Sequence, residues 1–246
     1  MNKIVILAAG KGTRMGLDMP KALVRLNGRP LISYVADSIV ASKVDDSPIV
    51  VVSPENKEAI KKELAQYNWQ YAIQEEQLGT GHAVKSAKDL VPSDCDRIIV
   101  LFCDQPFFSV ASILAAANAP SAKVLLMPTI LDDFNDWRHN FYRLGRIYRN
   151  KKGLVEKIIE FKDASEEEIA ITEINTGFMC FDNKWLWQNI EKLTNNNNNK
   201  EYYLTTLIEI AFADGHEIAT ININPREALG INSQEELLIA ENIDKE

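Results

Sequence analysis

Short apolar runs alternate with stretches of helical periodicity through the first half of the chain. The runs have the length of buried strands and lie at residues 4–9, 49–52, 71–73, 97–102 and 124–127. Between them, apolar residues recur at helical spacing over residues 31–41, 55–65, 79–90 and 109–118. Thr80 is placed to cap the third of these helices. This alternation predicts an α/β protein with a Rossmann-like, mostly parallel sheet between helices.

The pattern changes after about residue 129. Apolar stretches at residues 145–149, 154–161 and 174–181, separated by charged turns, predict strands of an antiparallel addition. A late strand at 218–223 and a closing helix at 235–243 follow, and the asparagine run at 195–199 predicts a solvated, mobile loop. We therefore expect one domain over residues 1–246, with a first part to about 128, an added part over about 129–230, and a closing segment at 231–246.

Composition narrows the functional class. With 246 residues, 46% of them hydrophobic, the chain can bury a full core, and no apolar run is long enough to span a bilayer. The net charge of −8 argues against broad nucleic-acid binding, which needs a positive surface. The three cysteines form no CxxC pair, which argues against disulfides and a zinc site. We therefore expect a cytoplasmic protein with neither a nucleic acid nor a membrane as its partner.

A glycine-rich loop follows the first strand, with the sequence Gly-Lys-Gly-Thr-Arg-Met-Gly at residues 10–16. Glycines let the backbone approach a phosphate closely, and turn amides then point at the anion. Lys11, Arg14 and Lys21 add positive charge in a protein that is acidic overall. An ordinary turn with exposed basic side chains has the same spacing, but this concentration of cations favours a phosphate ligand.

Two well-known phosphate loops do not match. A Walker loop ends in Gly-Lys-Ser/Thr, whereas Gly10-Lys11 is followed by Gly12. A dinucleotide fingerprint needs GxGxxG and an acidic residue at the end of the second strand. Here the glycine spacing is one residue too long, and Ser53 follows Val52. A nucleoside triphosphate is therefore favoured over a dinucleotide.

Two further polar residues follow buried strands, where ligands of such sheets bind. Asp104 is placed to hold Mg²⁺, which prefers oxygen ligands and binds together with substrate phosphates. An aspartate that starts the turn before Pro106 is an equal alternative. Gln74 offers a donor and an acceptor to a nucleobase, and Gly79 and Gly81 would let the backbone approach it, although a capped helix start has the same pattern.

Taken together, these stretches resemble the sugar-phosphate nucleotidylyltransferases over about residues 3–240. The sequence Leu-Ala-Ala-Gly-Lys-Gly-Thr-Arg-Met at residues 7–15, with Pro20-Lys21, is similar to the signature of that family. Further stretches are similar to the uridylyltransferase domain of the bacterial bifunctional N-acetylglucosamine-1-phosphate uridylyltransferase/glucosamine-1-phosphate acetyltransferases: residues 74–83, 145–147, 160–164, 173–177, 202–205 and 230–232. The resemblance implies the nucleotide-diphospho-sugar transferase fold, a three-layer, mixed and mostly parallel sheet with an antiparallel sugar-binding addition.

The resemblance also implies roles for individual residues. Nucleotide contacts fall on Leu7, Ala8, Gly10, Lys11, Gln74, Gly79 and Thr80, with Gln74 and Gly79 on the uracil. Arg14 and Lys21 match the catalytic cations on the triphosphate, and Asp104 and Asn232 match the protein ligands of Mg²⁺. The positions that line the amino-sugar phosphate are Gly145, Glu160, Asn175, Tyr203 and Thr205. Without the resemblance, Asn175 and Asn232 would be interpreted as turn residues.

The chain departs from the family pattern at three points. Phe102-Cys103 stands where the family has Tyr-Gly before Asp104, which removes a hydroxyl and places a side chain beside the metal position. Thr206 stands where the family usually has Asp. The sequence ends at Glu246 without hexapeptide repeats, so no acetyltransferase activity is expected and the oligomeric state stays unknown.

The implied reaction is attack of a sugar 1-phosphate on the α-phosphorus of UTP, which gives UDP-N-acetylglucosamine and pyrophosphate. A phosphate monoester has a second pKa of about 6, so it is mostly ionised at neutral pH and needs little help from a base. Alignment and charge stabilisation remain for the protein. Two alternatives stay open: the same reaction with another sugar phosphate or nucleotide, which Phe102-Cys103 motivates, and a nucleotide-sugar binding module without turnover.

Overall fold

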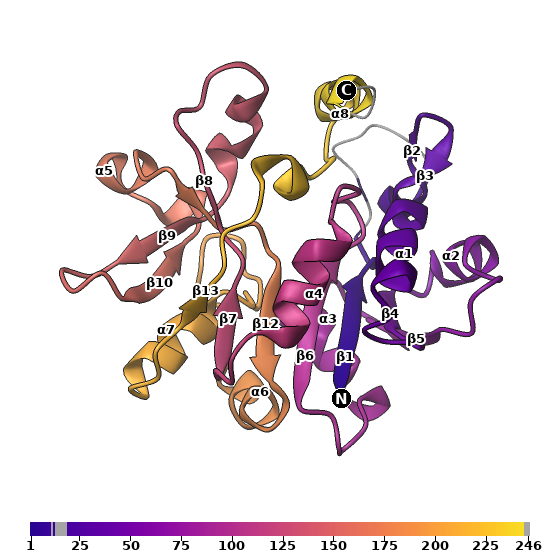
Figure 1. Cartoon of the computed structure of the whole chain (residues 1–246), viewed down its shortest axis with the longest axis horizontal. Coiled ribbons are helices and arrows are strands. Elements are labelled where there is room, and N and C mark those ends of the chain that lie inside the picture. Colours follow the sequence, from indigo (N-terminus) through magenta and orange to yellow (C-terminus); the bar gives the residue numbers. More distant parts are fainter. Residues whose placement is uncertain (11, 13–18, 244–246) are drawn as a thin grey trace.

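The central sheet follows the predicted alternation (Figure 1). The computed structural model describes residues 1–10, 12 and 19–243. In that part of the chain, the strands lie in the order β13-β7-β12-β6-β1-β4-β5. Their bounds are β1 (Asn2–Leu7), β4 (Ile49–Val52), β5 (Gln70–Ile73), β6 (Arg97–Phe102), β7 (Val124–Leu126), β12 (Met179–Asp182) and β13 (Ala219–Thr220). Only β12 is antiparallel to its neighbours, so the predicted α/β class with a mixed, mostly parallel sheet is confirmed.

Helices cover both faces of this sheet. One layer contains α1 (Leu31–Ser42), α2 (Lys57–Glu63) and α4 (Val110–Asn118), and the other contains α3 (Thr80–Ser86), α6 (Asn183–Asn189) and α7 (Thr206–Ala213). Successive side chains of a strand point to opposite faces, so Ile4 and Ile6 pack in the first layer and Val5 and Leu7 in the second. Since helices cover both faces, ligands can bind only at the edge of the sheet, at the carboxyl ends of the parallel strands.

A second, antiparallel sheet lies beside the central one (Figure 1). Within the described residues its strands, in the order β10-β9-β11-β8, are β8 (Thr129–Ile130), β9 (Arg146–Arg149), β10 (Val155–Ile159) and β11 (Glu173–Ile174). The chain passes from β7 into β8 and from β11 into β12, so two short connections join the sheets. The predicted antiparallel addition is therefore present.

The single strand expected at residues 174–181 is wrong. The run breaks at a turn in which Gly177 has a φ of 84° and Thr176 Oγ1 donates a hydrogen bond to Met127 O at 2.7 Å. β11 belongs to the second sheet, whereas β12 returns to the central sheet and pairs with β6 and β7. A run of apolar residues does not reveal that the chain changes sheets within it.

The remaining elements connect these layers. They are β2 (Arg25–Leu26), β3 (Arg29–Pro30), α5 (Glu166–Ile169), α8 (Gln234–Ile243) and the 3₁₀ segments Lys21–Leu23, Lys88–Leu90, Asp136–Arg143, Phe161–Asp163, Ile190–Lys192 and Pro225–Ala228. The late strand is shorter than predicted, and neither α6 nor α7 was predicted. No helix among residues 1–10, 12 and 19–243 is both long and apolar enough to cross a membrane.

The asparagine run at residues 195–199 is largely exposed, as expected of a solvated loop, and it makes hydrogen bonds to its neighbours. Asn198 Nδ2 donates hydrogen bonds to Lys162 O at 3.2 Å and to Asp163 Oδ1 at 2.6 Å. Asn199 Nδ2 donates to the hydroxyl of Tyr203 at 2.6 Å. These bonds attach the run to the 3₁₀ segment Phe161–Asp163, although several of the asparagines are exposed.

Candidate active site

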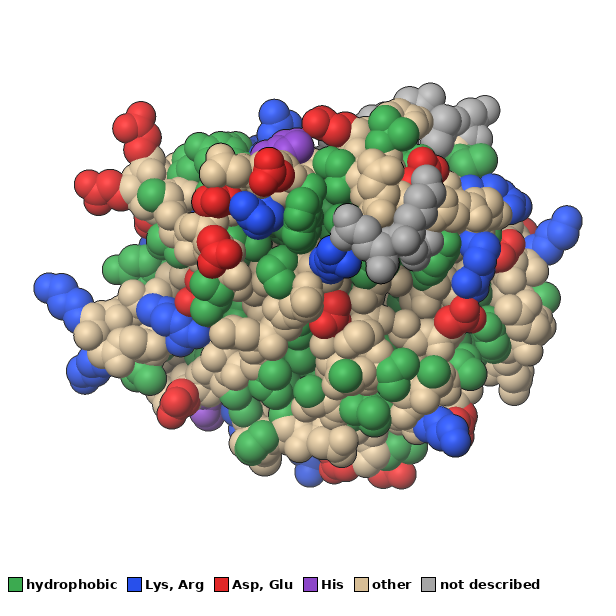
Figure 2. Space-filling view, turned by 45° about the horizontal axis from the view of Figure 1, so that its top comes forward, with side chains coloured by type: hydrophobic (Ala, Val, Ile, Leu, Met, Phe, Trp, Pro, Cys, Tyr) green, Lys and Arg blue, Asp and Glu red, His purple; other side chains and the backbone are tan. Residues whose placement is uncertain are grey.

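Two adjoining cavities lie at the carboxyl ends of β1, β5 and β6. The first, called here the Lys21 cavity, has a volume of about 230 Å³ and is lined by segments that follow β1 and β5. The second, the Asn175 cavity, has a volume of about 250 Å³ and lies towards the second sheet. Both are lined by Thr80, Phe102 and Asp104, so the cavities meet at these three residues. Figure 2 brings this edge forward and shows acidic and basic side chains interspersed on it.

Several of the predicted nucleotide contacts line the Lys21 cavity: Leu7, Gly10, Gln74, Gly79 and Thr80. Ala8 is buried below it, where its amide donates to Val51 O and its carbonyl accepts from Asn56 Nδ2, both at 2.8 Å. Lys11 and Arg14 lie outside the residues that the structure describes. Gly12 is described: its φ is 67°, and a Cβ there would lie 3.0 Å from Lys21 Cβ, so a glycine at this position lets the backbone lie close to Lys21.

Lys21 joins the predicted metal ligands. Its ammonium pairs with the Asp104 carboxylate and donates to Asn232 Oδ1 at 2.5 Å. Asn232 is brought there from the far end of the chain because Ile231 N donates to Asp104 O at 2.9 Å and Asn232 N donates to Glu236 Oε2 at 2.5 Å. The two side chains, Asp104 and Asn232, therefore present oxygen atoms to one cation.

This donor set fits Mg²⁺. The ion uses hard oxygen ligands, and in phosphate sites it takes one or two protein ligands together with waters and substrate phosphates. The Lys21 ammonium is a stand-in cation that marks where the oxygens of Asp104 and Asn232 converge. Among the described residues no group of three or more His, Cys, Asp or Glu could hold a metal ion. A site in which such side chains of the described residues supply every ligand is therefore excluded.

Gln74 has a fixed amide. It lies at the end of β5 with its backbone N–H on Val52 O at 2.8 Å. Its Nε2 lies 3.1 Å from Gly79 O, to which it donates, and 3.1 Å from His82 Nδ1. Both partners of Nε2 belong to the protein, so Oε1 is the group left for a ligand. Gln74 therefore offers a hydrogen-bond acceptor to the Lys21 cavity.

The segments 78–81 and 202–204, far apart in sequence, run side by side. Tyr202 N donates to Leu78 O at 2.7 Å and Gly81 N donates to Tyr202 O at 2.8 Å. Gly79 has a φ of 108°, and a Cβ there would lie 2.8 Å from Tyr202 O, so the approach requires glycine. Thr80 is not the helix cap that the sequence predicted: Gly79 holds that position, and Thr80 Oγ1 instead accepts from Leu204 N at 3.0 Å.

Four of the five residues predicted for the sugar phosphate line the Asn175 cavity: Gly145, Glu160, Asn175 and Thr205. Asn175 N donates to Gly145 O at 2.9 Å, and Thr205 Oγ1 donates to Glu160 Oε1 at 2.8 Å. Burial raises the pKa of the Glu160 carboxyl, against the lowering effect of the Thr205 hydroxyl. Tyr203 is not among the lining residues, and its hydroxyl accepts from Asn199.

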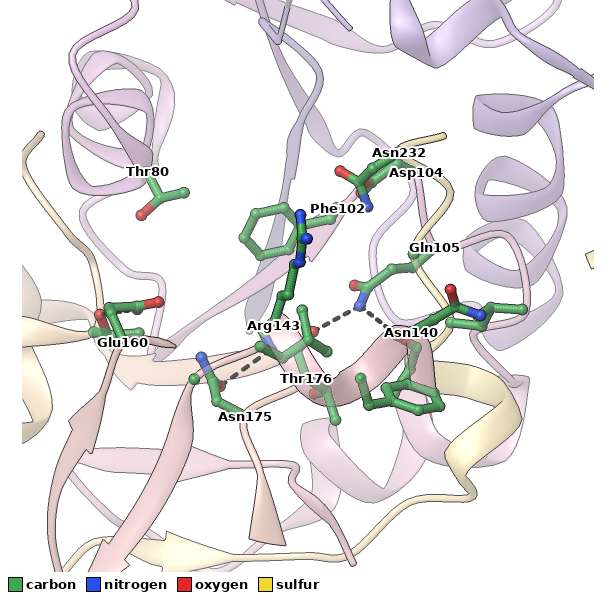
Figure 3. Close-up of a pocket in the computed structure, with 18 of the residues that line it drawn as sticks. Thr80, Phe102, Asp104, Gln105, Asn140, Arg143, Glu160, Asn175, Thr176 and Asn232 are labelled. Carbon is green, nitrogen blue, oxygen red and sulfur yellow. Dashed lines mark hydrogen bonds between the residues drawn. The ribbon is translucent and has the colours of Figure 1, made fainter. Parts of the chain in front are cut away.

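Sequence reasoning missed other residues that line this cavity, among them Gln105 and Arg143 (Figure 3). Arg143 is the only cation among the described lining residues, against the carboxylates of Asp104, Glu160 and Glu236. No local pattern could have revealed it, because it lies in the irregular 3₁₀ segment Asp136–Arg143. Gln105 has the appearance of an ordinary turn residue after Asp104, and only the folded chain shows where its amide points.

The Phe102-Cys103 departure is accommodated within the fold. The Phe102 ring packs on Gly177, where a Cβ would lie 2.8 Å from Phe102 Cε2, and it forms a wall of both cavities. Cys103 is buried in the core against the α1 layer. Burial, with a smaller contribution from Asp104, raises the pKa of the Cys103 thiol to about 12, so it stays protonated at neutral pH.

Arg146, part of the Gly-Arg-Ile stretch, is a structural support of the Asn175 cavity. Its side chain is fully buried at 0% exposure. The guanidinium donates to Ile169 O at 3.1 Å, to Tyr142 O at 2.7 Å and to Leu144 O, and it stacks on the Phe134 ring at 5.0 Å. These contacts hold the backbone on both sides of Arg143.

Among the described residues, Gly10, Lys21 and Asp104 line the Lys21 cavity at the carboxyl edge of the mixed α/β sheet. Residues 4–203 match the family described as MobA-like NTP transferase domain, and the chain belongs to that family. The resemblance to sugar-phosphate nucleotidylyltransferases is thereby confirmed at the level of the family.

Known proteins of similar sequence carry the name bifunctional protein GlmU. The chain is 38% identical to the one from Clostridium novyi, over 97% of this chain and 51% of that protein. It is 40% identical to the one from Bacillus velezensis, over 98% of this chain and 53% of that protein. The chain thus spans about half the length of the curated relatives it matches.

A solved structure shares the fold at low sequence identity. It is the 4-diphosphocytidyl-2C-methyl-D-erythritol synthase from Anaerococcus prevotii, with a TM-score of 0.71 and 17% identity. The match covers 100% of this chain and 96% of that one. It supports the architecture and leaves the substrates to be argued from the site.

Proposed function

We propose that this protein transfers a uridylyl group from UTP to N-acetylglucosamine 1-phosphate, with Mg²⁺, giving UDP-N-acetylglucosamine and pyrophosphate. The observation that carries the proposal is the junction of the two cavities at Thr80, Phe102 and Asp104. A nucleotide in the Lys21 cavity and a sugar phosphate in the Asn175 cavity would bring their reacting groups together beside Asp104. The family of the chain and its similarity to the GlmU proteins support the same reaction.

The choice of uracil rests on Gln74. Its Oε1 is an acceptor, since its Nε2 is held by Gly79 O and His82 Nδ1. Uracil presents an N3–H donor at the middle of its pairing edge, whereas cytosine presents an N3 acceptor there. An acceptor fixed in the cavity therefore favours UTP over CTP, because an unpaired acceptor facing an acceptor loses its hydrogen bond.

The protein's own part in the transfer is alignment and charge stabilisation. Asp104 and Asn232 would hold the Mg²⁺, which when bound supplies Lewis-acid polarisation of the α-phosphate. Lys21 would then donate to phosphate oxygens rather than to Asp104 and Asn232, and Arg14 would add a second cation from the glycine-rich loop. Arg143 lines the Asn175 cavity and would offset the negative charge of the acceptor phosphate.

The proton balance asks for no catalytic base. The attacking oxygen belongs to a phosphate monoester, whose second pKa is about 6, and it is therefore already ionised at neutral pH. Its lone pair forms the new bond to the α-phosphorus while the bond to pyrophosphate breaks. Side chains need only hold the attacking oxygen in line with the leaving group.

A second candidate is the same reaction with another sugar phosphate or another nucleotide. Two observations favour it. Phe102 replaces the tyrosine of the resembled family in the wall that both cavities share, so one hydroxyl is absent from the acceptor side. The neighbour of the same fold is named for a cytidyl product, so the fold alone does not choose the nucleobase.

A substrate panel tests the proposal. Pyrophosphate release is measured for UTP, CTP, GTP, ATP and dTTP, each with N-acetylglucosamine 1-phosphate, glucose 1-phosphate and galactose 1-phosphate, with and without Mg²⁺. We expect the highest kcat/KM for UTP with the acetamido sugar and no release without a divalent cation. A clear preference for another pair would establish the second candidate. Nucleotide binding without turnover across the panel would identify a binding module instead.

A further inference from the structure

We propose that Gln105 contacts the acceptor sugar: its Oε1 accepts a hydrogen bond from the amide N–H on the sugar carbon next to the one that carries the phosphate. The inference rests on the proposed function and deepens it, because it assigns a residue to the recognition of the 2-acetamido N–H. Three observations carry it: the fixed orientation of the Gln105 amide, its unpartnered oxygen, and its place beside Asp104 (Figure 3).

The amide orientation of Gln105 is determined by its surroundings. The side chain is buried, with 6% of the residue exposed. Nε2 donates to Thr176 O at 2.7 Å and to Ala228 O at 3.2 Å. A flipped amide would place Oε1 against two carbonyl oxygens, with acceptor facing acceptor at both. Both Nε2 protons are therefore engaged, and Oε1 has one direction in which to point.

That direction is the Asn175 cavity. Gln105 lines the cavity, and in Figure 3 its oxygen points to the side where Phe102 and Arg143 lie. Within the described part of the chain, Oε1 is a buried side-chain oxygen without a hydrogen-bond partner. Buried acceptors in native proteins are nearly always paired with protein, water or ligand, so an unpaired one in a cavity wall calls for a donor from the cavity.

The chemistry of the donor follows from its position. A phosphate or carboxylate oxygen at this point would face Oε1 acceptor to acceptor, so the anionic end of the ligand lies elsewhere, towards Lys21 and Asp104. Gln105 directly follows Asp104 in the chain, so the donor lies close to that anionic end. In a 2-acetamido sugar 1-phosphate, the amide N–H occupies the neighbouring carbon.

The test replaces the substrate N–H by oxygen. The substrate 2-O-acetylglucose 1-phosphate keeps the acetyl group and nearly the same shape but lacks the donor. We expect wild-type kcat/KM with UTP to be at least about tenfold lower for this ester than for N-acetylglucosamine 1-phosphate, as for other sites built to pair a substrate N–H. In Gln105→Met the same ratio should fall to less than about threefold, because neither substrate then has the acceptor.

Gln77→Met is the matched control. Gln77 Nε2 donates to the backbone Ala9 O at 2.8 Å in the Lys21 cavity, so this variant also loses a side-chain bond to a carbonyl. It should lower kcat/KM for both sugars alike and keep the wild-type ratio. A Gln105→Met ratio equal to the wild-type ratio would overturn the inference.

The wild-type protein alone tests the inference if Gln105→Met does not fold. Equal use of amide and ester by the wild type would overturn the inference, whatever the variant does. A wild-type kcat/KM that is lower for the ester, but not for 6-deoxy-N-acetylglucosamine 1-phosphate, supports a donor next to the phosphate. If the wild type releases pyrophosphate with none of these sugars, the proposed function fails and the inference fails with it.

Discussion

The Lys21 cavity and the Asn175 cavity share a wall but are built in different ways. The Lys21 cavity is formed mainly by the segments that directly follow β1 and β5, so most of its lining is set by local turns. The Asn175 cavity collects side chains from segments between Thr80 and Glu236, drawn from both sheets and from the turns that join them. One cavity depends on local backbone conformation, and the other depends on how the second sheet docks on the first.

The difference extends to their chemistry. The Lys21 cavity has a lysine and a glutamine with a fixed acceptor, which suit a triphosphate and a base. The Asn175 cavity has carboxylates and side-chain amides with a single described cation, which suit the hydroxyl and amide groups of a sugar. Changes far from either cavity should therefore affect the acceptor side before the nucleotide side, and substitutions on each side can test this contrast.

The largest effect is expected at the shared wall. Asp104→Ala removes the carboxylate that pairs with Lys21 beside Asn232. Under the proposed function, both substrates then lose their common anchor. We expect kcat to fall about 10³-fold, as when a main electrostatic contact of a transition state is removed. Steady-state pyrophosphate release at saturating Mg²⁺ measures it. The exposed Asp94→Ala is the control, and a tenfold or smaller loss for Asp104→Ala would contradict the metal assignment.

Arg146→Met should affect the Asn175 cavity more than the Lys21 cavity. The variant removes a buried guanidinium that donates to the carbonyl oxygens of Tyr142, Leu144 and Ile169 and so holds residues 142–144 in place. We expect a loss of about 3 kcal/mol in the free energy of unfolding, the upper range for hydrogen bonds to a charged group. We also expect a rise in KM for the sugar phosphate that exceeds the rise for UTP. Urea denaturation and steady-state kinetics measure the two effects.

Arg149→Met provides the control on the same strand. Arg149 is partly exposed and pairs with Glu173 at 2.7 Å, so its removal should lower stability by no more than about 1 kcal/mol. Equal KM rises for both substrates in Arg146→Met would show that the cavities are coupled more tightly than their construction indicates.

The same contrast explains what could be predicted from the sequence. The central-sheet strands and the α-helices up to about residue 127 were predicted to within a few residues, because each is a continuous run or a regular period, whereas the short strands β2 and β3 were not predicted. The return of β12 to the central sheet was missed, since a continuous apolar run gives no sign of the break at Gly177, where the backbone lies against the Phe102 ring. Gln105 and Arg143 were missed because their positions in the cavity arise from contacts between distant segments.

Gln74→Met tests the nucleotide side alone. It removes the acceptor that we assign to the uracil N3–H and keeps a side chain of similar length. We expect the kcat/KM preference for UTP over CTP to fall about tenfold, the value of one hydrogen bond in a buried site, with KM for the sugar phosphate unchanged. Gln70→Met, at the other end of β5, is the control. A retained preference would show that another group selects the base.

Glu160→Gln should give the smallest effect, and it tests how far the Asn175 cavity excludes water. Burial, aided by Asp163 and Glu201, raises the pKa of Glu160 above the ordinary 4.5. A raised pKa gives stability that is present below the unfolded value and lost as the pH rises through the folded one. The glutamine variant cannot ionise and keeps an acceptor for Thr205. It should therefore gain free energy of unfolding relative to wild type as the pH rises above the ordinary carboxyl pKa of 4.5.

Glu168→Gln is the control with the opposite sign. The Ser165 backbone N–H lowers the pKa of Glu168 in the capping box of α5, so its contribution is present above the unfolded pKa and lost as the pH falls. This variant should lose stability relative to wild type at neutral pH and recover it on acidification. Urea denaturation of wild type and both variants across that range measures the differences. If the two variants shift in the same direction, the Asn175 cavity is as open to water as the surface helix, and its contrast with the Lys21 cavity rests on architecture alone.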